Sequence, residues 1–270
     1  MIGSRATRAL FAAAMFVAPL GASAYAASCG NTAAGFEDWK RAYASEARSR
    51  GIGGAGAAAL MTTTYSHATI SADRGQKSFK LSLEEFLAKR GGPAIVARGR
   101  QLKRTEAAMF ASIEQRYGVP PGPLLAIWGM ETGFGRMRGN QNALSAVATL
   151  AYDCRRTEFF SDQLDAALKL VDRGILSANS RGSMHGEVGH TQFLPKNVLL
   201  YSSGSLDNVE TALAATANFL KAHGWRPHVG YQPGEPNFAA IQAWNAASVY
   251  ERAIAILGKQ IDSGGVAAID

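Results

Sequence analysis

Cysteine is scarce in this chain: Cys29 and Cys154 are the only two among 270 residues. Zinc and iron–sulfur sites that rest on thiolates need several cysteines at short spacings, so sites of that kind are excluded. In an oxidising compartment the two thiols can form one disulfide, which would tie the N-terminal segment to the central region. Two alternatives stay open: both thiols are unpaired, or Cys29 carries a lipid, which would also exclude the disulfide.

Sequence motifs of several common enzyme classes are missing as well. There is no G-x-S-x-G turn of the kind that carries a serine nucleophile. No Gly-rich phosphate-binding loop precedes a predicted helix. Strand patterns are few, and the chain has no internal repeat. Serine-nucleophile chemistry and phosphate binding of the P-loop type therefore have no support, and we expect no cofactor.

Long hydrophobic runs are also lacking. The apolar stretch at residues 9–20 follows two arginines and precedes Ala-Tyr-Ala at residues 24–26. It is too short to span a bilayer, and the pattern is typical of a signal peptide cleaved after about residue 26. We therefore expect residues 1–26 to be a signal peptide and the protein to be periplasmic or secreted. A lipoprotein anchored at Cys29 is the weaker alternative, because Ala26 stands where lipoproteins usually have Leu.

The net charge is +7 at pH 7, which favours an anionic partner or surface. A basic cluster at residues 98–104 has no interleaved aromatic residues, so we expect no nucleic-acid binding. A solvated helix face explains that cluster adequately. For an exported protein, an anionic cell-wall polymer is a reasonable partner.

Helical spacing of apolar residues dominates the mature chain, as in Phe36, Trp39 and Tyr43. Residues 62–79 and 177–205 are expected to be extended, loop or hairpin segments, because Ser, Thr, Gly and Asn are frequent there. The remaining predicted helices cover residues 93–117, 120–131, 143–152, 158–173, 207–223 and 247–261. We expect a linker at 27–35, one mainly α domain with a sizeable core at 36–262 and a tail at 263–270.

Glu131 ends the apolar run at residues 124–130 and is followed by Thr-Gly-Phe-Gly at residues 132–135. The run opens with Pro-Pro-Gly-Pro at residues 120–123, which suits a helix start, and the two glycines suit a helix end. A carboxyl group in apolar surroundings, near the negative end of a helix dipole, stays protonated more easily. That is the state of a general acid at neutral pH. The alternative is a solvated glutamate on an ordinary helix.

Residues 182–195 read GSMHGEVGHTQFLP and form a second unusual stretch. Its His185, Glu187 and His190 lie close together, but their H-x-E-x-x-H order differs from the helical H-E-x-x-H of zinc proteases. The glycines also argue against a helix, so we expect no metal site. A tight loop that lets the backbone approach a ligand fits better.

Three side chains of this loop suggest the kind of ligand. Ser183 and Gln192 are neutral hydrogen-bonding groups, and Phe193 offers an aromatic face. This combination suits a sugar better than a phosphate. Ordinary glycosidases use two carboxylates that flank the bond. Glu131 has no obvious partner in the sequence, although Glu187 or Asp153 could approach it in space.

Two further groups of residues allow more than one interpretation. Arg155 and Arg156 precede a predicted helix, where they can simply pair with Asp153 or with Glu158. Asn245 precedes the last predicted helix, and asparagine is a good N-cap residue. From the residues alone, a structural role is at least as well supported for these positions as ligand binding.

Six pieces of sequence, taken in order, are more specific than any one of them. They are YGVP at 117–120, WGMETGFG at 128–135, ATLAYDCRR at 148–156, GHTQFLP at 189–195, ANFLKAHGW at 217–225, and Asn245. Together they resemble the lytic murein transglycosylases of the membrane-bound lytic transglycosylase B family. The resemblance covers roughly residues 36–260, nearly the whole mature chain.

The resemblance implies a mainly α, lysozyme-like domain around a long groove, with a small loop or hairpin region. Glu131 falls on the single catalytic acid/base of the family, which cleaves the β-1,4 bond between N-acetylmuramic acid and N-acetylglucosamine in peptidoglycan. The muramyl 6-hydroxyl then closes on C1 and forms a 1,6-anhydromuramyl end. The implied partners are peptidoglycan glycan strands, together with envelope machinery, and the protein is expected to be a monomer.

By position in the motifs, the resemblance also implies substrate-binding residues. They are Ser183, Gln192, Phe193, Arg155, Arg156, Asn245 and Tyr250. The chain departs from the family pattern at Trp244 and Phe219, which replace tyrosines and remove two hydroxyl groups, and at His190, which replaces glutamine. The run of alternating Asp and Gly that binds calcium in the family is missing, so we expect no structural calcium. A hydrolase of the same fold and an inactive peptidoglycan-binding scaffold remain as alternatives.

Overall fold

The computed structural model describes residues 28–75 and 81–264, so the expected signal peptide lies outside the described residues. The described chain is mainly helical and contains one two-stranded antiparallel sheet. None of its helices has the length and apolar character needed to cross a bilayer. In chain order the elements are η1 (Ala33–Gly35), α1 (Phe36–Ser45), η2 (Ala47–Arg50), α2 (Gly54–Met61), α3 (His67–Arg74), α4 (Leu83–Arg90), α5 (Gly92–Thr105), α6 (Ala107–Tyr117), α7 (Pro121–Thr132), β1 (Gln141–Asn142), α8 (Ala143–Tyr152), α9 (Thr157–Asp172), β2 (Arg181–Gly182), α10 (Pro195–Tyr201), α11 (Val209–Ala222), α12 (Phe238–Trp244) and α13 (Ser248–Ser263).

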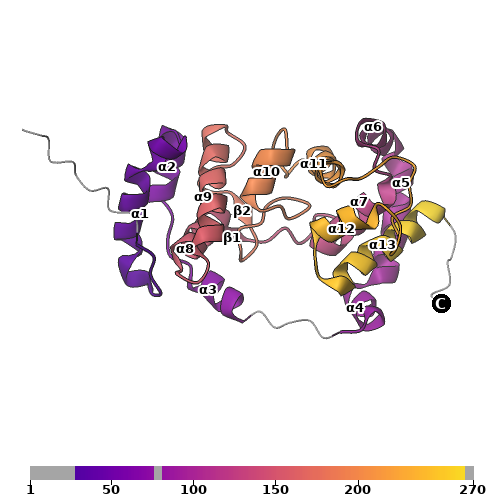
Figure 1. Cartoon of the computed structure of the whole chain (residues 1–270), viewed down its shortest axis with the longest axis horizontal. Coiled ribbons are helices and arrows are strands. Elements are labelled where there is room, and N and C mark those ends of the chain that lie inside the picture. The colour runs from indigo at the N-terminus through magenta and orange to yellow at the C-terminus, as the bar shows by residue number, and fades with distance from the viewer. Residues whose placement is uncertain (1–27, 76–80, 265–270) are drawn as a thin grey trace, which may run out of the picture.

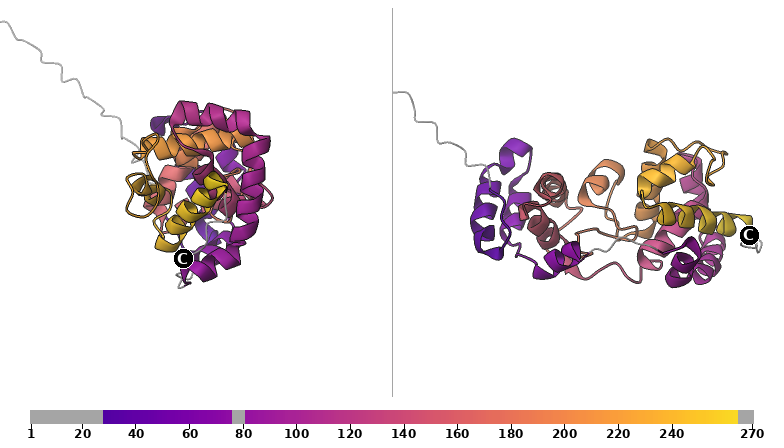
Figure 2. Two further views of the ribbon diagram at one scale, coloured as in Figure 1. Left: turned by 90° about the vertical axis from the view of Figure 1, so that its right-hand side faces the viewer. Right: turned by 60° about the horizontal axis from the view of Figure 1, so that its bottom comes forward.

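The helices form an elongated molecule with two lobes (Figures 1 and 2). The first lobe contains α1, α2, α3, α8 and α9, and the second contains α4 to α7 and α11 to α13. Helix α10 packs against both α9 and α11, and so lies between the lobes. Each lobe has its own apolar core, whereas the sequence led us to expect one. The extent of the single domain predicted at residues 36–262 stays a prediction.

The two cores meet inside short stretches of chain. Phe193 belongs to the core of the second lobe, while the next residue, Leu194, packs against that of the first. At the start of α8, Ala143 belongs to the core of the second lobe and Leu144 to the core of the first. The loop that carries the Gly-rich segment is therefore anchored in both lobes.

Helix α7 lies in the core of the second lobe and is buried on all sides from Pro121 to Met130. Proline fits its first turn because the N–H that proline lacks would have no partner inside the helix. Gly133, with φ 57°, ends it in the left-handed conformation that glycine tolerates. Gly122 allows α13 to pack closely, since an added Cβ would lie 2.3 Å from the carbonyl oxygen of Gly258. The helix therefore brings Glu131 to the point where it leaves the core.

The single helix predicted over residues 93–117 is instead two helices. Helix α5 ends at Thr105 and α6 begins at Ala107, because Glu106 adopts φ −109° and ψ 29°, outside the helical region. The apolar spacing did not reveal this break, since Leu102 before it and Phe110 after it are buried in the same core.

The expectation of an extended or loop segment over residues 62–79 is wrong where α3 forms. Ser66 acts as its N-cap, with its side chain accepting a hydrogen bond from the N–H of Thr69. The loop or hairpin expected over residues 177–205 is confirmed in part. Strand β2 pairs with β1, with Gln141 opposite Gly182, but the same stretch also contains α10. Helix α12 was not predicted at all.

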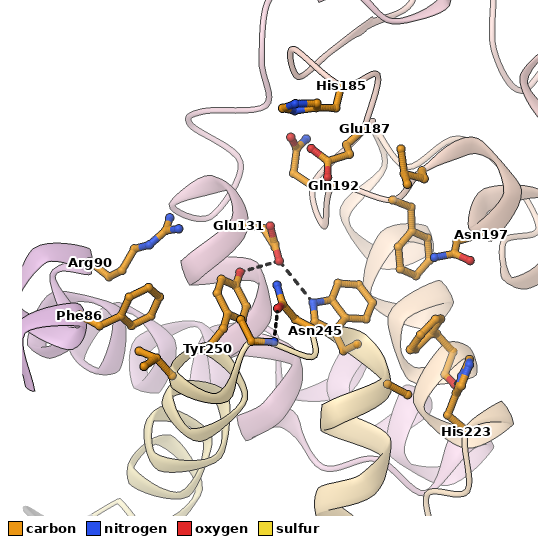
Figure 3. A pocket seen from close by; sticks show the side chains of 17 residues that line it. Phe86, Arg90, Glu131, His185, Glu187, Gln192, Asn197, His223, Asn245 and Tyr250 are labelled. Atoms are coloured by element: carbon orange, nitrogen blue, oxygen red, sulfur yellow. Dashed lines mark hydrogen bonds between the residues drawn. The ribbon is translucent and has the colours of Figure 1, made fainter. Parts of the chain in front are cut away.

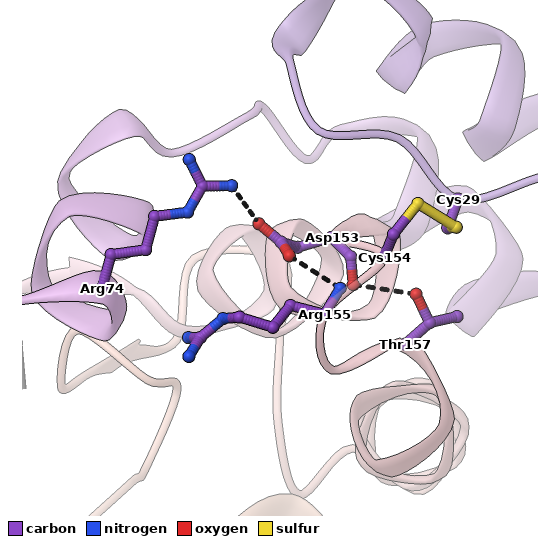
Figure 4. The surroundings of a disulfide bond; sticks show 6 residues. All are labelled: Cys29, Arg74, Asp153, Cys154, Arg155 and Thr157. Carbon is purple, nitrogen blue, oxygen red and sulfur yellow. Dashed lines mark hydrogen bonds and ion pairs between the residues drawn. A yellow bond between two sulfur atoms is a disulfide. The ribbon is translucent and has the colours of Figure 1, made fainter.

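A disulfide joins Cys29 to Cys154, which is one of the three states that the sequence allowed. It leaves no thiol on Cys29 for a lipid. Figure 4 shows the bond beside Asp153, whose carboxylate accepts hydrogen bonds from Arg74 Nη2 at 2.9 Å and from the backbone N–H of Arg155 at 3.0 Å. The start of the described chain is thus fixed to the C-terminal end of α8.

Candidate active site

A cavity of about 1010 Å³ opens where the two lobes meet (Figure 3). Its wall includes residues of α4, α7, α10, α11, α12 and α13 and the loop between β2 and α10. The lining residues are Phe86, Arg90, Glu131, His185, Glu187, Gln192, Phe193, Leu194, Asn197, Phe219, His223, Ala243, Trp244, Asn245, Ala247, Val249 and Tyr250. A cavity of this size, with a partly apolar wall from which polar side chains project into the space, is typical of a ligand-binding site.

Glu131 is the next-to-last residue of α7 and opens onto this cavity. The protein encloses most of its side chain, and this desolvation raises the pKa of Glu131 to about 7. The negative charge of Glu187 also raises that pKa, while hydrogen bonds from Tyr250 and Trp244 and the positive charge of Arg90 lower it. Near neutral pH the carboxyl group is therefore partly protonated, as a general acid requires.

Two side chains hold one oxygen of this carboxyl group. The phenol of Tyr250 donates a hydrogen bond to Oε1 of Glu131 at 2.6 Å, and the indole Nε1 of Trp244 donates to the same oxygen at 3.3 Å. Trp244 lacks the hydroxyl of the tyrosine in the family pattern, but its indole N–H supplies a hydrogen bond to the acid. Oε2 of Glu131 forms no hydrogen bond with the residues that the structure describes and is the oxygen available to carry a proton to a ligand.

The loop between β2 and α10 forms one wall of the cavity, and Gln192 and Phe193 line it as the sequence predicts. Gln192 adopts φ 54°, which is rare outside glycine. Its amide Nε2 donates to the carbonyl oxygens of Gly189, at 2.9 Å, and Arg138, at 3.2 Å. The side-chain nitrogen thus stabilises the loop. Phe193 packs at 5.0 Å between ring centroids against Trp244 and contributes an aromatic surface.

Ser183, also predicted to bind substrate, is not among the residues that line the cavity. Its hydroxyl donates to Oε2 of Glu187 at 2.7 Å and accepts from the backbone N–H groups of His185 and Glu187, both at 3.1 Å. Ser183 therefore fixes the position of Glu187. Glu187, one of the two acids that the sequence allowed to approach Glu131 in space, lies in the same cavity as Glu131.

Asn245 and Tyr250 both line the cavity. Asn245 is not the N-cap of the last helix, because α13 begins after Ala247. Its Oδ1 instead accepts a hydrogen bond from the N–H of Ala247 at 3.0 Å. Phe219 stacks on His223 with 3.9 Å between ring centroids. At this position an apolar ring faces the cavity, without the hydroxyl group that the family pattern has.

Arg155 and Arg156 do not line this cavity. Both form ion pairs with the buried Asp73, and not with Asp153 or Glu158 through their guanidinium groups as the sequence suggested. Nε2 of His185, a residue of the cavity wall, lies 4.0 Å from the same carboxylate. The arginine pair is thus connected to the edge of the cavity through Asp73, and its role in substrate binding stays a prediction.

His190 forms hydrogen bonds with two residues of α7. Its Nδ1 accepts a hydrogen bond from the indole of Trp128 at 3.1 Å, and its carbonyl accepts from the hydroxyl of Thr132 at 2.7 Å. Desolvation lowers the pKa of His190, so its neutral form is favoured. Within residues 28–75 and 81–264, no group of three His, Cys, Asp or Glu side chains is arranged to hold a metal ion.

Known proteins resemble this chain in sequence and in architecture. The family model described as "Transglycosylase SLT domain" matches residues 35–234. Membrane-bound lytic murein transglycosylase B of Escherichia coli (strain K12) is 38% identical over 120 residues, which cover 41% of this chain and 33% of that protein. The match thus spans about a third of the length of this curated relative.

Solved structures give the same result over a longer span. SltB3 from Pseudomonas aeruginosa in complex with NAG-anhNAM-pentapeptide has a TM-score of 0.77 and 27% identity, covering 84% of this chain and 79% of that one. Its complex with NAG-NAM-pentapeptide has a TM-score of 0.79 and 26% identity, with coverages of 87% and 83%. The family match covers well over half of the chain. This protein therefore belongs to the transglycosylase SLT domain family and has the mainly helical, lysozyme-like fold of the lytic transglycosylases.

Proposed function

We propose that this protein is a lytic transglycosylase that cleaves the β-1,4 bond between N-acetylmuramic acid and N-acetylglucosamine in peptidoglycan. The observation that carries the proposal is Glu131, a carboxyl group enclosed by protein, with a pKa raised to about 7 and facing a cavity large enough for sugars. Such a group can give a proton at neutral pH and take one back later in the same reaction.

In the first step, Glu131 donates its proton to the glycosidic oxygen as the bond from that oxygen to C1 of the muramyl residue breaks. The acetamido group of the same sugar helps to stabilise the positive charge that develops at C1. Tyr250 and Trp244 stabilise the carboxylate that remains, since both donate hydrogen bonds to its Oε1. The two donors keep Oε2 free to face the sugar.

In the second step, the ionised Glu131 accepts the proton of the muramyl 6-hydroxyl as its oxygen forms a bond to C1. The product is a 1,6-anhydromuramyl end, and no water is consumed. Glu131 is protonated again at the end of the cycle. One carboxyl group is sufficient for this sequence, because the substrate supplies its own nucleophile.

For binding, we propose that the glycan strand lies in the cavity against Gln192, Phe193, Asn245 and Tyr250, which all line it. SltB3, a structural relative, has been solved with NAG-anhNAM-pentapeptide and NAG-NAM-pentapeptide, which supports a substrate of this class. The pair Arg155 and Arg156 completes the proposed set of substrate-binding residues, toward the peptide stem at the edge of the cavity. Ser183 contributes to binding through Glu187, a cavity residue to which its hydroxyl donates.

We further propose that residues 36–262 form the catalytic domain and that the enzyme works without a cofactor, as a monomer in the periplasm or outside the cell. Peptidoglycan lies in that compartment, and the disulfide between Cys29 and Cys154 suits its oxidising conditions. Association with envelope machinery would direct cutting to particular sites.

Digestion of purified peptidoglycan sacculi tests the proposal, with the soluble products identified by mass spectrometry. We expect muropeptides with 1,6-anhydromuramyl ends from the wild type and none from Glu131→Gln. Glu210→Gln, which changes an exposed glutamate on α11, should behave as the wild type. If the wild type binds sacculi but releases no product, the protein is a scaffold and the proposal is wrong.

A further inference from the structure

A second carboxyl group, Glu187, faces the same cavity as Glu131, and the one-acid reaction above does not use it. It belongs to the loop between β2 and α10, whereas Glu131 comes from α7. Figure 3 shows the two carboxyl groups directed toward one another, with Glu187 on the loop side of Glu131 and Tyr250 on its other side. The two acids thus belong to separate structural elements on either side of the cavity.

Hydrogen bonds around the Ser183 hydroxyl hold Glu187 in place, and in them Glu187 is a hydrogen-bond acceptor. The oxygen of the Ser183 hydroxyl accepts hydrogen bonds from the backbone N–H groups of His185 and Glu187. The hydroxyl proton is therefore what remains to be donated. That proton goes to Oε2 of Glu187 at 2.7 Å. A backbone hydrogen bond from the N–H of Ser183 to the carbonyl of Glu187, at 2.9 Å, closes the turn. Oε2 of Glu187 is therefore a hydrogen-bond acceptor in this turn.

No Lys or Arg forms an ion pair with Glu187 in the part of the chain that the structure describes. Its negative charge acts across the cavity and opposes ionisation of Glu131. The site holds one carboxyl group that is partly protonated near neutral pH and a second that accepts a hydrogen bond. A pair with these two properties is what enzymes that hydrolyse glycosidic bonds with water use.

We propose that Glu187 is a general base that gives this enzyme a second, hydrolytic activity on the same glycosidic bond. The inference rests on the proposed function, because it takes the same substrate and the same acid. The two reactions share their first step and differ in the nucleophile that reaches C1. The muramyl 6-hydroxyl gives the anhydro end, and a water molecule bound by Glu187 gives a reducing end.

The hydrolytic step balances with water as its only added reactant. Glu131 gives its proton to the leaving oxygen while the bond between that oxygen and C1 breaks. The oxygen of water forms the new bond to C1, and Glu187 accepts a proton from this water. Glu187 then releases that proton to solvent and Glu131 takes one up, which restores both groups. The products are a reducing muramyl end and a free 4-hydroxyl on N-acetylglucosamine.

The ratio of the two products tests this inference. Sacculi are digested with the full chain, the products are reduced with borohydride, and anhydro and reduced muramyl ends are quantified by mass spectrometry. Ends already present are subtracted using a Glu131→Gln digest. We expect new reducing ends beside anhydro ends from the wild type. Glu187→Gln, which keeps the shape of the side chain but removes the base, should lower the ratio of reducing to anhydro ends by about tenfold or more.

Glu210→Gln serves as the control and should keep the wild-type ratio, since Glu210 is exposed on α11. Anhydro ends alone from the wild type would overturn the inference while leaving the proposed function intact, and this result requires no variant to fold. An unchanged ratio in Glu187→Gln would also overturn it. If the wild type forms neither kind of end, the proposed function itself has failed.

Discussion

The phenol oxygen of Tyr250 lies 2.6 Å from Oε1 of Glu131, so that a residue of α13 holds the carboxyl group at the end of α7. The Tyr250 ring is buried, and its pKa is well above the ordinary value because of desolvation first and the charge of Glu131 second. The phenol therefore stays protonated and always donates. This contact links the position of the acid to its proton affinity.

The rate of peptidoglycan cleavage should fall as the pH rises above about 7. Glu131 must be protonated to start the reaction, and its pKa is raised to about 7, mainly by desolvation. Above that pH the rate should drop tenfold for each pH unit, as for any single required acid. Initial rates on soluble muropeptides between pH 5 and pH 9 measure this limb. A flat profile from pH 6 to pH 9 would contradict the assignment of Glu131.

Tyr250→Phe should move this limb to higher pH. The variant removes a hydrogen bond that favours the ionised form and lowers the pKa of Glu131. Hydrogen bonds to charged groups contribute about 1.5 to 3 kcal/mol, so the pKa should rise by about one unit or more. The rate then stays near its maximum to a higher pH and falls with the same slope beyond it, although the maximum itself is lower. Tyr201→Phe is a suitable control, because the Tyr201 ring packs on Phe219 and His223 outside the lining of the cavity.

Glu131→Gln should unfold less readily than the wild type at pH 8. The folded-state pKa of Glu131 is raised above the value of the free side chain, so its stabilising contribution is complete below about pH 4.5 and is lost as the pH rises through about 7. The neutral amide avoids this loss and still accepts hydrogen bonds from Tyr250 and Trp244. The gain should be on the order of 3 kcal/mol at pH 8 and close to zero at pH 4. Urea unfolding at both pH values measures it, and equal gains at the two would contradict the raised pKa.

Cys154→Ser should lower the free energy of unfolding. The disulfide closes a sequence separation of 125 residues, for which the chain-entropy model predicts a loss of up to about 5 kcal/mol, and measured losses are commonly smaller. Cys29→Ser should cause the same loss, and the double variant should lose no more than either alone. A loss in the double variant that equals the sum of the two single losses would show that the cysteines stabilise the fold separately.

Calcium removal should leave the melting temperature unchanged. The chain lacks the alternating Asp and Gly run of a calcium loop, and the segment between α10 and α11 is short and rich in Ser. Thermal unfolding followed by circular dichroism, with and without a calcium chelator, tests this. A clear fall in melting temperature that added calcium reverses would refute it.

Much of the catalytic helix was predictable from the sequence. The prolines at its start, its apolar run and Gly133 fix both ends of α7, and the raised pKa of Glu131 follows from its place at the end of a buried helix. Helices α8, α9, α11 and α13 also lie close to their predicted bounds. These elements have long apolar patterns, and such patterns are the most reliable local signal.

Other features depend on contacts between distant residues. The ion pairs of Arg155 and Arg156 with Asp73 join segments about 80 residues apart, and nothing in the local sequence selects that partner. The indole of Trp244 reaches Glu131 only because α12 lies over the end of α7. For Glu187 the sequence did give one indication, because it is a carboxylate in the same Gly-rich loop as Gln192 and Phe193. That Glu187 faces Glu131 could not be predicted, because only the folded chain brings the loop next to α7.

Phe193 and Leu194 are adjacent in the chain but pack in different cores, so the two lobes cannot be separated without disrupting this loop. A truncated variant that keeps only one lobe would expose the apolar face against which the other half of this loop packs, and it would separate Glu187 from its surroundings. Two complementary fragments, expressed together, should instead reassemble and regain activity. We therefore expect the proposed activity to require both lobes, with neither sufficient by itself.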